Sequence, residues 1–184
     1  IVAILGVETS YGTTMGNDSV LVSLYTLGFH HRRRGKFFRS ELGHYLRLAT
    51  DQGWTLDARK GSYAGAMGMG QFMPSSYRQW AVDFDGDGAI DLFGSRADAI
   101  GSVANYLADH GWKRGGAVLE EASGDPRRSG VAAPGDTKLF VFDEADGPSY
   151  RLGHPNFRVI LTYNRSPLYA RAVWELAQAV AEGG

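Results

Sequence analysis

One stretch of this sequence reads Asp83-Phe84-Asp85-Gly86-Asp87-Gly88-Ala89-Ile90-Asp91, with carboxylates at alternate positions and a glycine at the sixth. The pattern matches the first half of a helix–loop–helix calcium loop, in which several acids converge on one hard cation and the glycine lets the chain turn sharply. A complete loop carries a bidentate Glu at position twelve, where this chain has Gly94. The stretch therefore predicts a calcium site, but it does not predict a calcium sensor.

The segments on either side of this loop are typical of helices. Pro74 fits the first turn of a short helix that continues to Val82, and residues 96–110 repeat apolar side chains at helical spacing. Further helices are expected at 1–10, 19–27, 36–50, 156–163 and 168–181. Between 115 and 153 glycine, proline and aspartate become frequent, and short apolar runs at 138–142 and 149–152 predict strands. The predicted fold class is α+β and mainly α, with a small β excursion.

The composition is that of a folded protein with one domain. The 184 residues are 43% hydrophobic and 21% charged, which is enough for a sizeable core. A net charge of −1 argues against a general binder of nucleic acid or of membrane surfaces. The absence of cysteine excludes disulfides, thiolate catalysis and cysteine-based zinc sites. No apolar run reaches the length of a membrane helix, and the apolar start of the chain, which lacks a signal peptide's basic region, is expected to continue an upstream segment.

Glu8 is one candidate for chemistry. It follows seven mostly apolar residues and precedes Thr9-Ser10-Tyr11-Gly12, so its carboxyl group is expected at the edge of an apolar helix. Partial desolvation favours the protonated form of a carboxyl group near neutral pH, which is the property of a general acid that cleaves a glycosidic bond. The alternative is a Glu that caps the helix end or faces solvent, and spacing alone favours this second interpretation.

The glycine- and methionine-rich segment 61–77 predicts a sugar-binding loop or a tightly packed one. Its glycines allow close backbone approach, and Ser62 and Gln71 offer hydrogen bonds. Apolar faces for the CH groups of a sugar would come from Met69, Phe72, Met73 and Tyr77. Methionines also fill gaps in cores, and composition leaves the two interpretations even.

Three other features have a structural and a functional interpretation. Asn164, in Tyr163-Asn164-Arg165-Ser166-Pro167, fits a turn or a helix cap, and the tyrosines nearby fit a core. The run His30-His31-Arg32-Arg33-Arg34 fits a solvated basic loop, with attraction of an anionic polymer as the alternative. Zinc-protease, nucleotide-binding and α/β-hydrolase motifs are absent from the sequence.

Taken in order, these segments resemble the lytic murein transglycosylases of the membrane-bound B type. The matching blocks are residues 6–12, 61–77, 81–88, 98–106 and 163–166. The resemblance covers nearly all of the chain except the excursion at 115–153. It implies a single lysozyme-like catalytic domain over 1–184, with a helical core and an EF-hand-like calcium loop.

The resemblance also implies an activity and the residues that carry it. These enzymes cleave the β-1,4 bond between N-acetylmuramic acid and N-acetylglucosamine in peptidoglycan without water, and Glu8 matches their sole catalytic acid/base. The positions that match their glycan groove are Ser62, Gln71, Tyr106, Tyr163, Asn164 and Tyr169. The calcium ligands correspond to Asp83, Asp85, Asp87, the carbonyl of Ala89, and Asp98. Asp98 is one residue further from Asp83 than the family spacing, and Asp91 is the alternative ligand, through water.

Further expectations follow from this resemblance. Calcium would be structural, and no organic cofactor and no nucleic acid are expected. The protein would be a periplasmic monomer that acts on glycan strands, with an outer-membrane anchor in a segment outside this chain and with unidentified partners among wall-synthesis enzymes or amidases. The alternatives are a lysozyme-type hydrolase of the same bond, a non-catalytic wall-binding module, and a calcium-regulated interaction protein.

Overall fold

The computed structural model describes residues 1–122 and 135–183, and these residues form two compact units, 1–106 and 107–184. The division falls inside one helix, α5 (Arg96–Asp109). The first unit begins with α1 (Val2–Thr9), which is followed by the short strand β1 (Asp18–Ser19). The single catalytic domain expected from the sequence stays a prediction.

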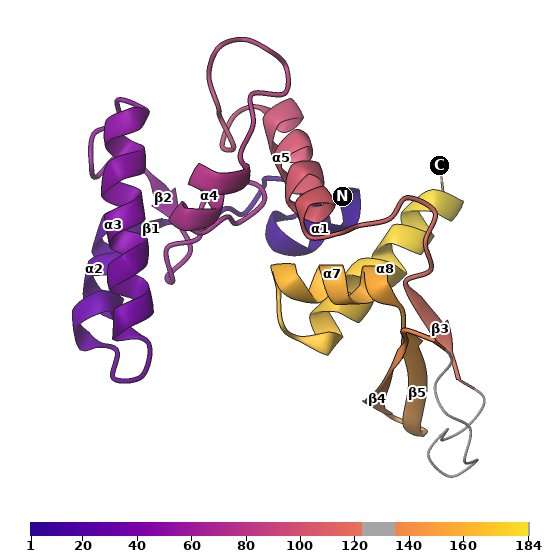
Figure 1. Cartoon of the computed structure of the whole chain (residues 1–184). Helices are drawn as coiled ribbons and strands as arrows, with labels where there is room; N and C mark the ends of the chain where they lie inside the picture. The colour runs from indigo at the N-terminus through magenta and orange to yellow at the C-terminus, as the bar shows by residue number, and fades with distance from the viewer. Residues whose placement is uncertain (123–134, 184) are drawn as a thin grey trace. The chain divides into compact units, whose positions relative to one another are not determined.

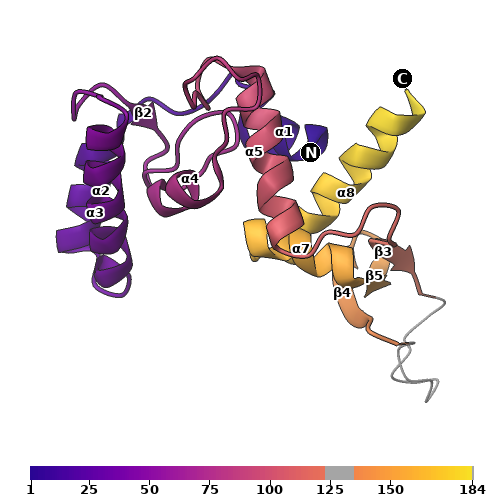
Figure 2. The same ribbon diagram turned by 45° about the horizontal axis from the view of Figure 1, so that its top comes forward.

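A helical hairpin is the largest element of the first unit. Its two helices, α2 (Val20–His30) and α3 (Gly35–Asp51), lie side by side and run in opposite directions (Figures 1 and 2). Ser19 begins α2 as its N-cap, because its Oγ accepts the backbone N–H of Val22 at 3.4 Å. The face of α3 that packs inward carries large buried side chains, among them Phe38, Tyr45 and Leu48.

The rest of the first unit connects this hairpin to a loop-rich region. Strand β2 (Lys60–Gly61) pairs with β1 in antiparallel register, Asp18 opposite Gly61. The loop that follows leads into α4 (Pro74–Trp80), which packs against α3. Proline at the first position of α4 costs no hydrogen bond there, because the first N–H groups of a helix have no partner within it.

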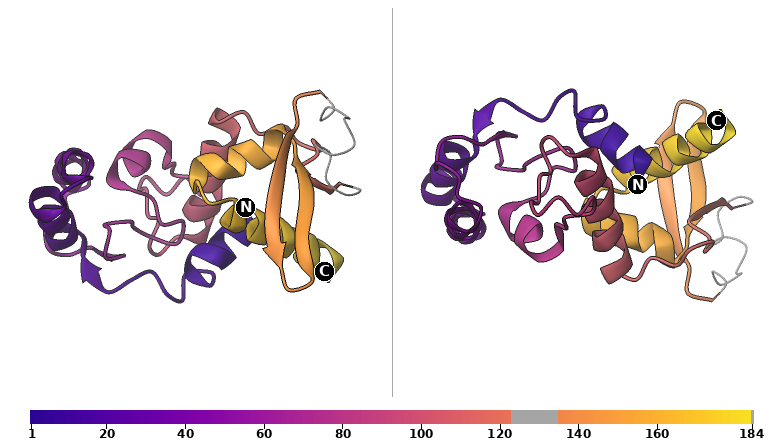
Figure 3. Two further views of the ribbon diagram at one scale, coloured as in Figure 1. Left: turned by 90° about the horizontal axis from the view of Figure 1, so that it is seen from below. Right: turned by 90° about the horizontal axis from the view of Figure 1, so that it is seen from above.

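The second unit consists of a small sheet and two helices. Its strands are β3 (Leu119–Glu121), β4 (Lys138–Glu144) and β5 (Gly147–Gly153), in the antiparallel order β3-β5-β4. The helices α7 (Pro155–Tyr163) and α8 (Pro167–Glu182) pack on each other, and α7 also packs on β5 (Figure 3). The ring centroids of Phe140 and Phe157 are 4.8 Å apart in its core.

Each helix and strand expected from the sequence is present, with ends that differ by a few residues. The predicted α+β, mainly helical class is confirmed. The short strands β1, β2 and β3 were not predicted, because strands of two or three residues carry no periodicity. Part of the excursion at 115–153, residues 123–134, lies outside the described residues. None of the described helices is long and apolar enough to cross a membrane.

Candidate active site

Glu8 lies in the last turn of α1 and is partly buried. The helix ends directly after it, because Ser10 has φ 49° and the backbone N–H groups of Ser10 and Tyr11 donate to the carbonyls of Gly6 and Leu5. The carboxyl group is therefore placed at the end of an apolar helix, where the sequence predicted it.

Thr9, the next residue, holds this helix end against the loop 61–73. Its side chain is 1% exposed, and its hydroxyl donates to the carbonyl of Met69 at 2.8 Å. The same oxygen accepts the backbone N–H of Gly12 at 2.9 Å. Thr9 was not among the predicted site residues, because its contact with Met69 depends on tertiary packing that the local sequence does not report. Thr9 thus fixes the end of α1, on which Glu8 lies, against this loop.

We expect Thr9→Val to lower both stability and activity. The substitution keeps the shape but leaves the buried carbonyl of Met69 without its donor, which costs about 1–2 kcal/mol and lowers the Tm by about 2–8 °C. In the reaction expected from the resemblance, the rate should fall more than the affinity for the substrate. Thr50→Val is the matched control, because the hydroxyl of Thr50 is exposed and bonds only to the carbonyl of Leu46 in its own helix. Equal effects of the two variants would contradict the positioning role.

The loop 61–73 is built mostly as packing. Met69, Phe72 and Tyr77 are buried, with exposed fractions of 8%, 3% and 2%, so the packing interpretation applies to them, whereas Met73 is partly exposed. The hydroxyl of Tyr77 donates to the carbonyl of Ile90 at 2.7 Å, and burial raises the pKa of Tyr77 to about 12. These side chains form the support of the loop.

Ser62 and Gln71 shape the same loop. The Oγ of Ser62 accepts the N–H groups of Ala64 and Ala66 at 3.3 and 3.0 Å. The amide nitrogen of Gln71 donates to the carbonyls of Met15 and Gly68 at 3.1 and 3.0 Å. Both side chains are partly exposed, so the hydroxyl proton of Ser62 and the amide oxygen of Gln71 are the groups suited to a ligand.

Residues with a strained backbone lie at the end of α1 and in the loop 61–73. Among the described residues, the non-glycine residues with positive φ are Ser10, Tyr11 and Gln71, at 49°, 60° and 52°. Side chains are disfavoured in this region, and residues held there are concentrated at functional sites. Ser10 and Tyr11 directly follow Glu8 and Thr9, and Gln71 lies in the loop 61–73.

Tyr106, on α5, is 7% exposed, and its ring centroid lies 4.8 Å from that of Trp80 and 6.0 Å from that of Phe72. It is mainly a core aromatic residue of the first unit.

A second unpredicted contact lies at α4, where buried Glu41 accepts the N–H and the hydroxyl of Ser75 at 2.9 and 2.8 Å. The first N–H groups of a helix have no partner within it, so a helix that begins at Pro74 predicts an acceptor for the N–H of Ser75.

The remaining predicted groove residues belong to the second unit. Asn164 ends α7 and is exposed, and its Oδ1 accepts the N–H of Ser166 at 3.1 Å, which is the turn role expected of it. Ser166 in turn caps α8 by accepting the N–H of Tyr169 at 3.3 Å. Tyr163 and Tyr169 are partly exposed.

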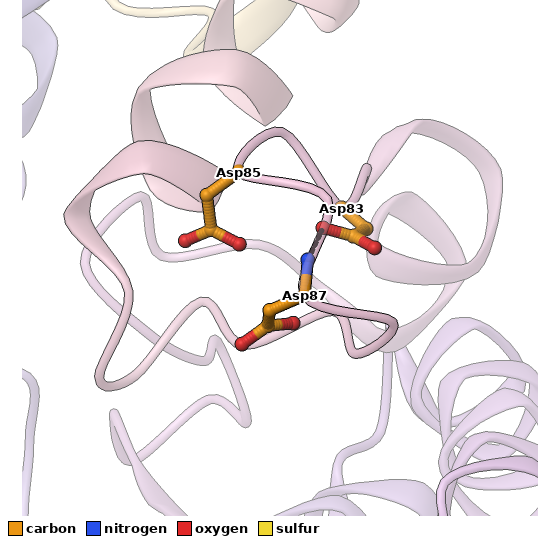
Figure 4. A group of neighbouring side chains, drawn as sticks. All are labelled: Asp83, Asp85 and Asp87. Carbon is orange, nitrogen blue, oxygen red and sulfur yellow. Dashed lines mark hydrogen bonds between the residues drawn. The ribbon is translucent and has the colours of Figure 1, made fainter.

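The acidic loop brings Asp83, Asp85 and Asp87 together, with one carboxylate oxygen of each within 4.8 Å of the others (Figure 4). Asp83 organises the turn. Its Oδ1 accepts the N–H groups of Gly86 and Asp87 at 2.7 and 3.2 Å, and its Oδ2 accepts that of Gly88 at 2.8 Å. Three carboxylates this close repel one another, and an all-oxygen set of this kind fits a hard cation such as Ca²⁺.

Asp98 plays a different part from the three grouped acids. It is 1% exposed, its Oδ1 accepts the N–H of Phe84, and its Oδ2 accepts the N–H of Asp91, both at 2.8 Å. It thus joins the two limbs of the loop from the first turn of α5, and it is not among the grouped carboxylates that the described residues contain. Asp91 accepts the N–H of Phe93, and the N–H of Ala89 donates to Asp87.

Comparison with known proteins gives consistent similarities. Residues 1–178 match a family described as transglycosylase SLT domain. The chain is 45% identical over 203 residues to the membrane-bound lytic murein transglycosylase B of Escherichia coli K12, which covers 98% of this chain and 56% of that protein. The chain therefore spans little more than half of this relative.

Two solved structures are also similar. The Escherichia coli lytic transglycosylase Slt35 in complex with calcium has a TM-score of 0.91 and 43% identity, over 99% of this chain and 65% of that chain. SltB3 from Pseudomonas aeruginosa, in complex with NAG-anhNAM-pentapeptide, has a TM-score of 0.80 and 36% identity, over 94% of this chain and 53% of that chain.

Proposed function

The chain belongs to the transglycosylase SLT domain family, and from this membership we propose that it is a peptidoglycan lytic transglycosylase. Its substrate would be the β-1,4 bond between N-acetylmuramic acid and N-acetylglucosamine, cleaved without water. The observation that carries the proposal is the family match over residues 1–178, a range that contains Glu8 at the end of its apolar helix.

One carboxyl group is sufficient for the reaction. Glu8 donates its proton to the glycosidic oxygen as the bond from that oxygen to C1 of the muramyl residue breaks. The carbonyl oxygen of the 2-acetamido group of the sugar stabilises the positive charge that develops at C1. Glu8, now a carboxylate, takes the proton of the muramyl C6 hydroxyl, and O6 bonds to C1 to close a 1,6-anhydro ring. Glu8 regains its proton, and no water is consumed.

The choice of a lyase over a hydrolase is supported by one relative. SltB3 was solved in complex with NAG-anhNAM-pentapeptide, a ligand whose name denotes an anhydro-muramyl residue. A lysozyme-type muramidase that uses the same Glu8 would give a reducing muramyl end, and this is the second candidate function. Retaining glycosidases use a pair of carboxylates, whereas substrate-assisted enzymes are the exception to which this mechanism is related.

The proposed glycan contacts come from both units. In the first unit they are Ser62, Gln71 and Tyr106, and in the second they are Tyr163, Asn164 and Tyr169. Ser62, Gln71, Tyr163 and Tyr169 are partly exposed, Asn164 is exposed and Tyr106 is largely buried. Hydroxyl and amide side chains of this kind can hydrogen-bond to sugar hydroxyls, which supports the proposal.

The proposed metal is a structural Ca²⁺ in the acidic loop. Asp83, Asp85 and Asp87 would hold it with the carbonyl of Ala89, and the loop would be completed by Asp98 or, through water, by Asp91. The calcium complex of Slt35 and the oxygen-only donor set support this assignment. Bound Ca²⁺ would supply positive charge that holds the loop together. We further propose a periplasmic monomer with an anchor outside this chain, as the membrane-bound relative suggests.

Product analysis tests the proposed function. Purified murein should release fragments whose muramyl ends are anhydro rings, one water lighter than hydrolysed ends, and digestion in ¹⁸O-labelled water should introduce no label. Reducing, labelled muramyl ends would identify a muramidase instead. Binding to murein without release of soluble fragments would identify a non-catalytic wall-binding module.

A further inference from the structure

The outer face of α2 carries an apolar stripe whose side chains are more than half exposed. The helix contains no Asp, Glu, Lys or Arg, yet Val22, Tyr25 and Phe29 are 59%, 55% and 56% exposed. Their spacing of three and four residues places them on one side of the helix. The rings of Tyr25 and Phe29 are in contact, with centroids 4.9 Å apart. Contiguous exposed apolar surface of this kind marks an interaction site.

A cluster of cations lies where this stripe ends. We call residues 30–39 the cationic tip; it contains five cations, Arg32, Arg33, Arg34, Lys36 and Arg39. There is no acidic residue between Asp18 and Glu41, and Glu41 is buried and bonded to Ser75. Outside the tip the chain has 14 Lys and Arg against 20 Asp and Glu. The tip is therefore strongly positive although the net charge of the whole chain is −1.

The tip is hollowed between the ends of α2 and α3. A pocket of about 390 Å³ is lined by the ring of Phe29 and by basic side chains, among them His31, Arg32, Arg33, Lys36 and Arg39. Next to the pocket, α2 and α3 are joined by a hydrogen bond. Nη1 of Arg39, on α3, donates to the carbonyl of Gly28, on α2, at 2.5 Å. An added Cβ at Gly35 would lie 2.9 Å from that carbonyl oxygen, so the pocket rests on backbone.

The tip is also ordered by its own contacts. Nδ1 of His31 accepts the N–H groups of Arg33 and Arg34 at 3.3 and 3.2 Å. The guanidinium of Arg34 lies 4.6 Å from the ring centroid of Phe37. Arg32, Arg33 and Lys36 form no ion pair with the residues that the structure describes, and their charges are available to a ligand.

We propose that the apolar stripe and the cationic tip together dock on an anionic lipid surface. Aromatic side chains beside arginine and lysine are typical of helices that lie in the membrane interface, and phosphate groups of lipids attract such clusters. The pocket, with one aromatic wall and basic rims, fits a phosphate head group. The whole-chain charge argued against membrane-surface binding, and the local distribution of charge reverses that expectation.

The chemistry of the segment favours lipid over wall glycan. Sugars are recognised by amide and carboxylate side chains beside aromatic rings, and residues 20–39 contain no Asp, Glu, Asn or Gln. The exposed side chain of Val22 is aliphatic and offers no hydrogen bond to a glycan hydroxyl. Docking of the stripe on another protein domain would not require five unneutralised cations at its end.

Vesicle sedimentation tests the proposal. The protein should bind vesicles of phosphatidylglycerol and phosphatidylcholine but not of phosphatidylcholine alone, and binding should weaken as salt is raised. Arg32→Gln/Arg33→Gln should lower the affinity at least about tenfold. Lys113→Gln/Arg114→Gln is the matched control, since it removes two equally exposed charges outside the tip. Tyr25→Ser/Phe29→Ser tests the stripe with all cations kept and should also weaken binding.

The outcomes separate this proposal from its alternatives and from the proposed function. Cleavage of soluble murein fragments should be unchanged in the tip variant. Equal binding to both kinds of vesicle, or an equal loss in the control variant, would overturn the proposal. So would a tip variant that keeps its vesicle binding but loses its binding to murein, because the tip would then bind the wall. Unchanged binding of the stripe variant would overturn docking by the stripe.

Discussion

Replacing Glu8 with glutamine is expected to lower the release of anhydromuropeptides from purified murein by about 10²–10⁴-fold, the usual contribution of a general acid–base group. The amide keeps the size and polarity of the side chain but cannot donate a proton to the glycosidic oxygen. The measurement is the rate of release of soluble anhydro products by mass spectrometry. Because Glu8 is partly exposed at a helix end, the Tm of the variant should differ little from that of the parent chain.

Two controls make this result decisive. Glu182→Gln makes the same change at an exposed site near the end of α8 and should keep full turnover. Binding of Glu8→Gln to murein should be retained, since the proposed glycan contacts are untouched. Near-normal turnover of the Glu8 variant would contradict the assignment of the acid/base, and it would favour the alternative of a solvent-facing Glu at the helix end.

Calcium is expected to raise the Tm by roughly 5–10 °C when it is present at about 100 times its dissociation constant. A ligand bound only by the folded state at that concentration contributes about 2.7 kcal/mol, and proteins of this size gain about 2–4 °C per kcal/mol. The physical source is the relief of repulsion among Asp83, Asp85 and Asp87. Turnover of the folded protein should change much less than its Tm.

The comparison is made between excess calcium and excess chelator. Asp85→Asn/Asp87→Asn removes two charges but keeps amide oxygens that can accept the bonds from Ser95 and Ala89, so it should lose most of the calcium effect. Asp143→Asn, exposed on β4, is the control and should keep it. A Tm that is the same with calcium and with chelator would contradict a structural metal in this loop.

Most of the helical fold was predictable because it depends on local periodicity. The apolar repeats of α3 and α5, and Pro74 at the start of α4, were sufficient to place those helices. The lysozyme-like fold was inferred from the resemblance of ordered blocks, and the similarity to Slt35 confirms it. Pairing of β1 with β2 joins residues about forty positions apart, and no local pattern reports such a contact.

The candidate site was predictable only in part. Acidic residues at alternate positions predicted that Asp83, Asp85 and Asp87 lie together. The position of Glu8 at a helix end followed from an apolar run that ends at a turn. The bonds of Thr9 to Met69 and of Asp98 to both limbs of the loop depend on tertiary packing, so the sequence did not reveal them. The assignments of the catalytic, glycan and metal residues stay predictions until the variants above are measured.

The left-handed residues Ser10, Tyr11 and Gln71 have a consequence for protein engineering. Each side chain in that conformation costs about 1 kcal/mol or more, a cost that glycine would not carry. A laboratory selection for heat resistance alone would therefore favour glycine at Ser10 and Tyr11, without regard to the proposed activity. At Gln71 the loss of the two hydrogen bonds of its amide would offset the gain. Screens for robust forms of this protein should score activity from the first round.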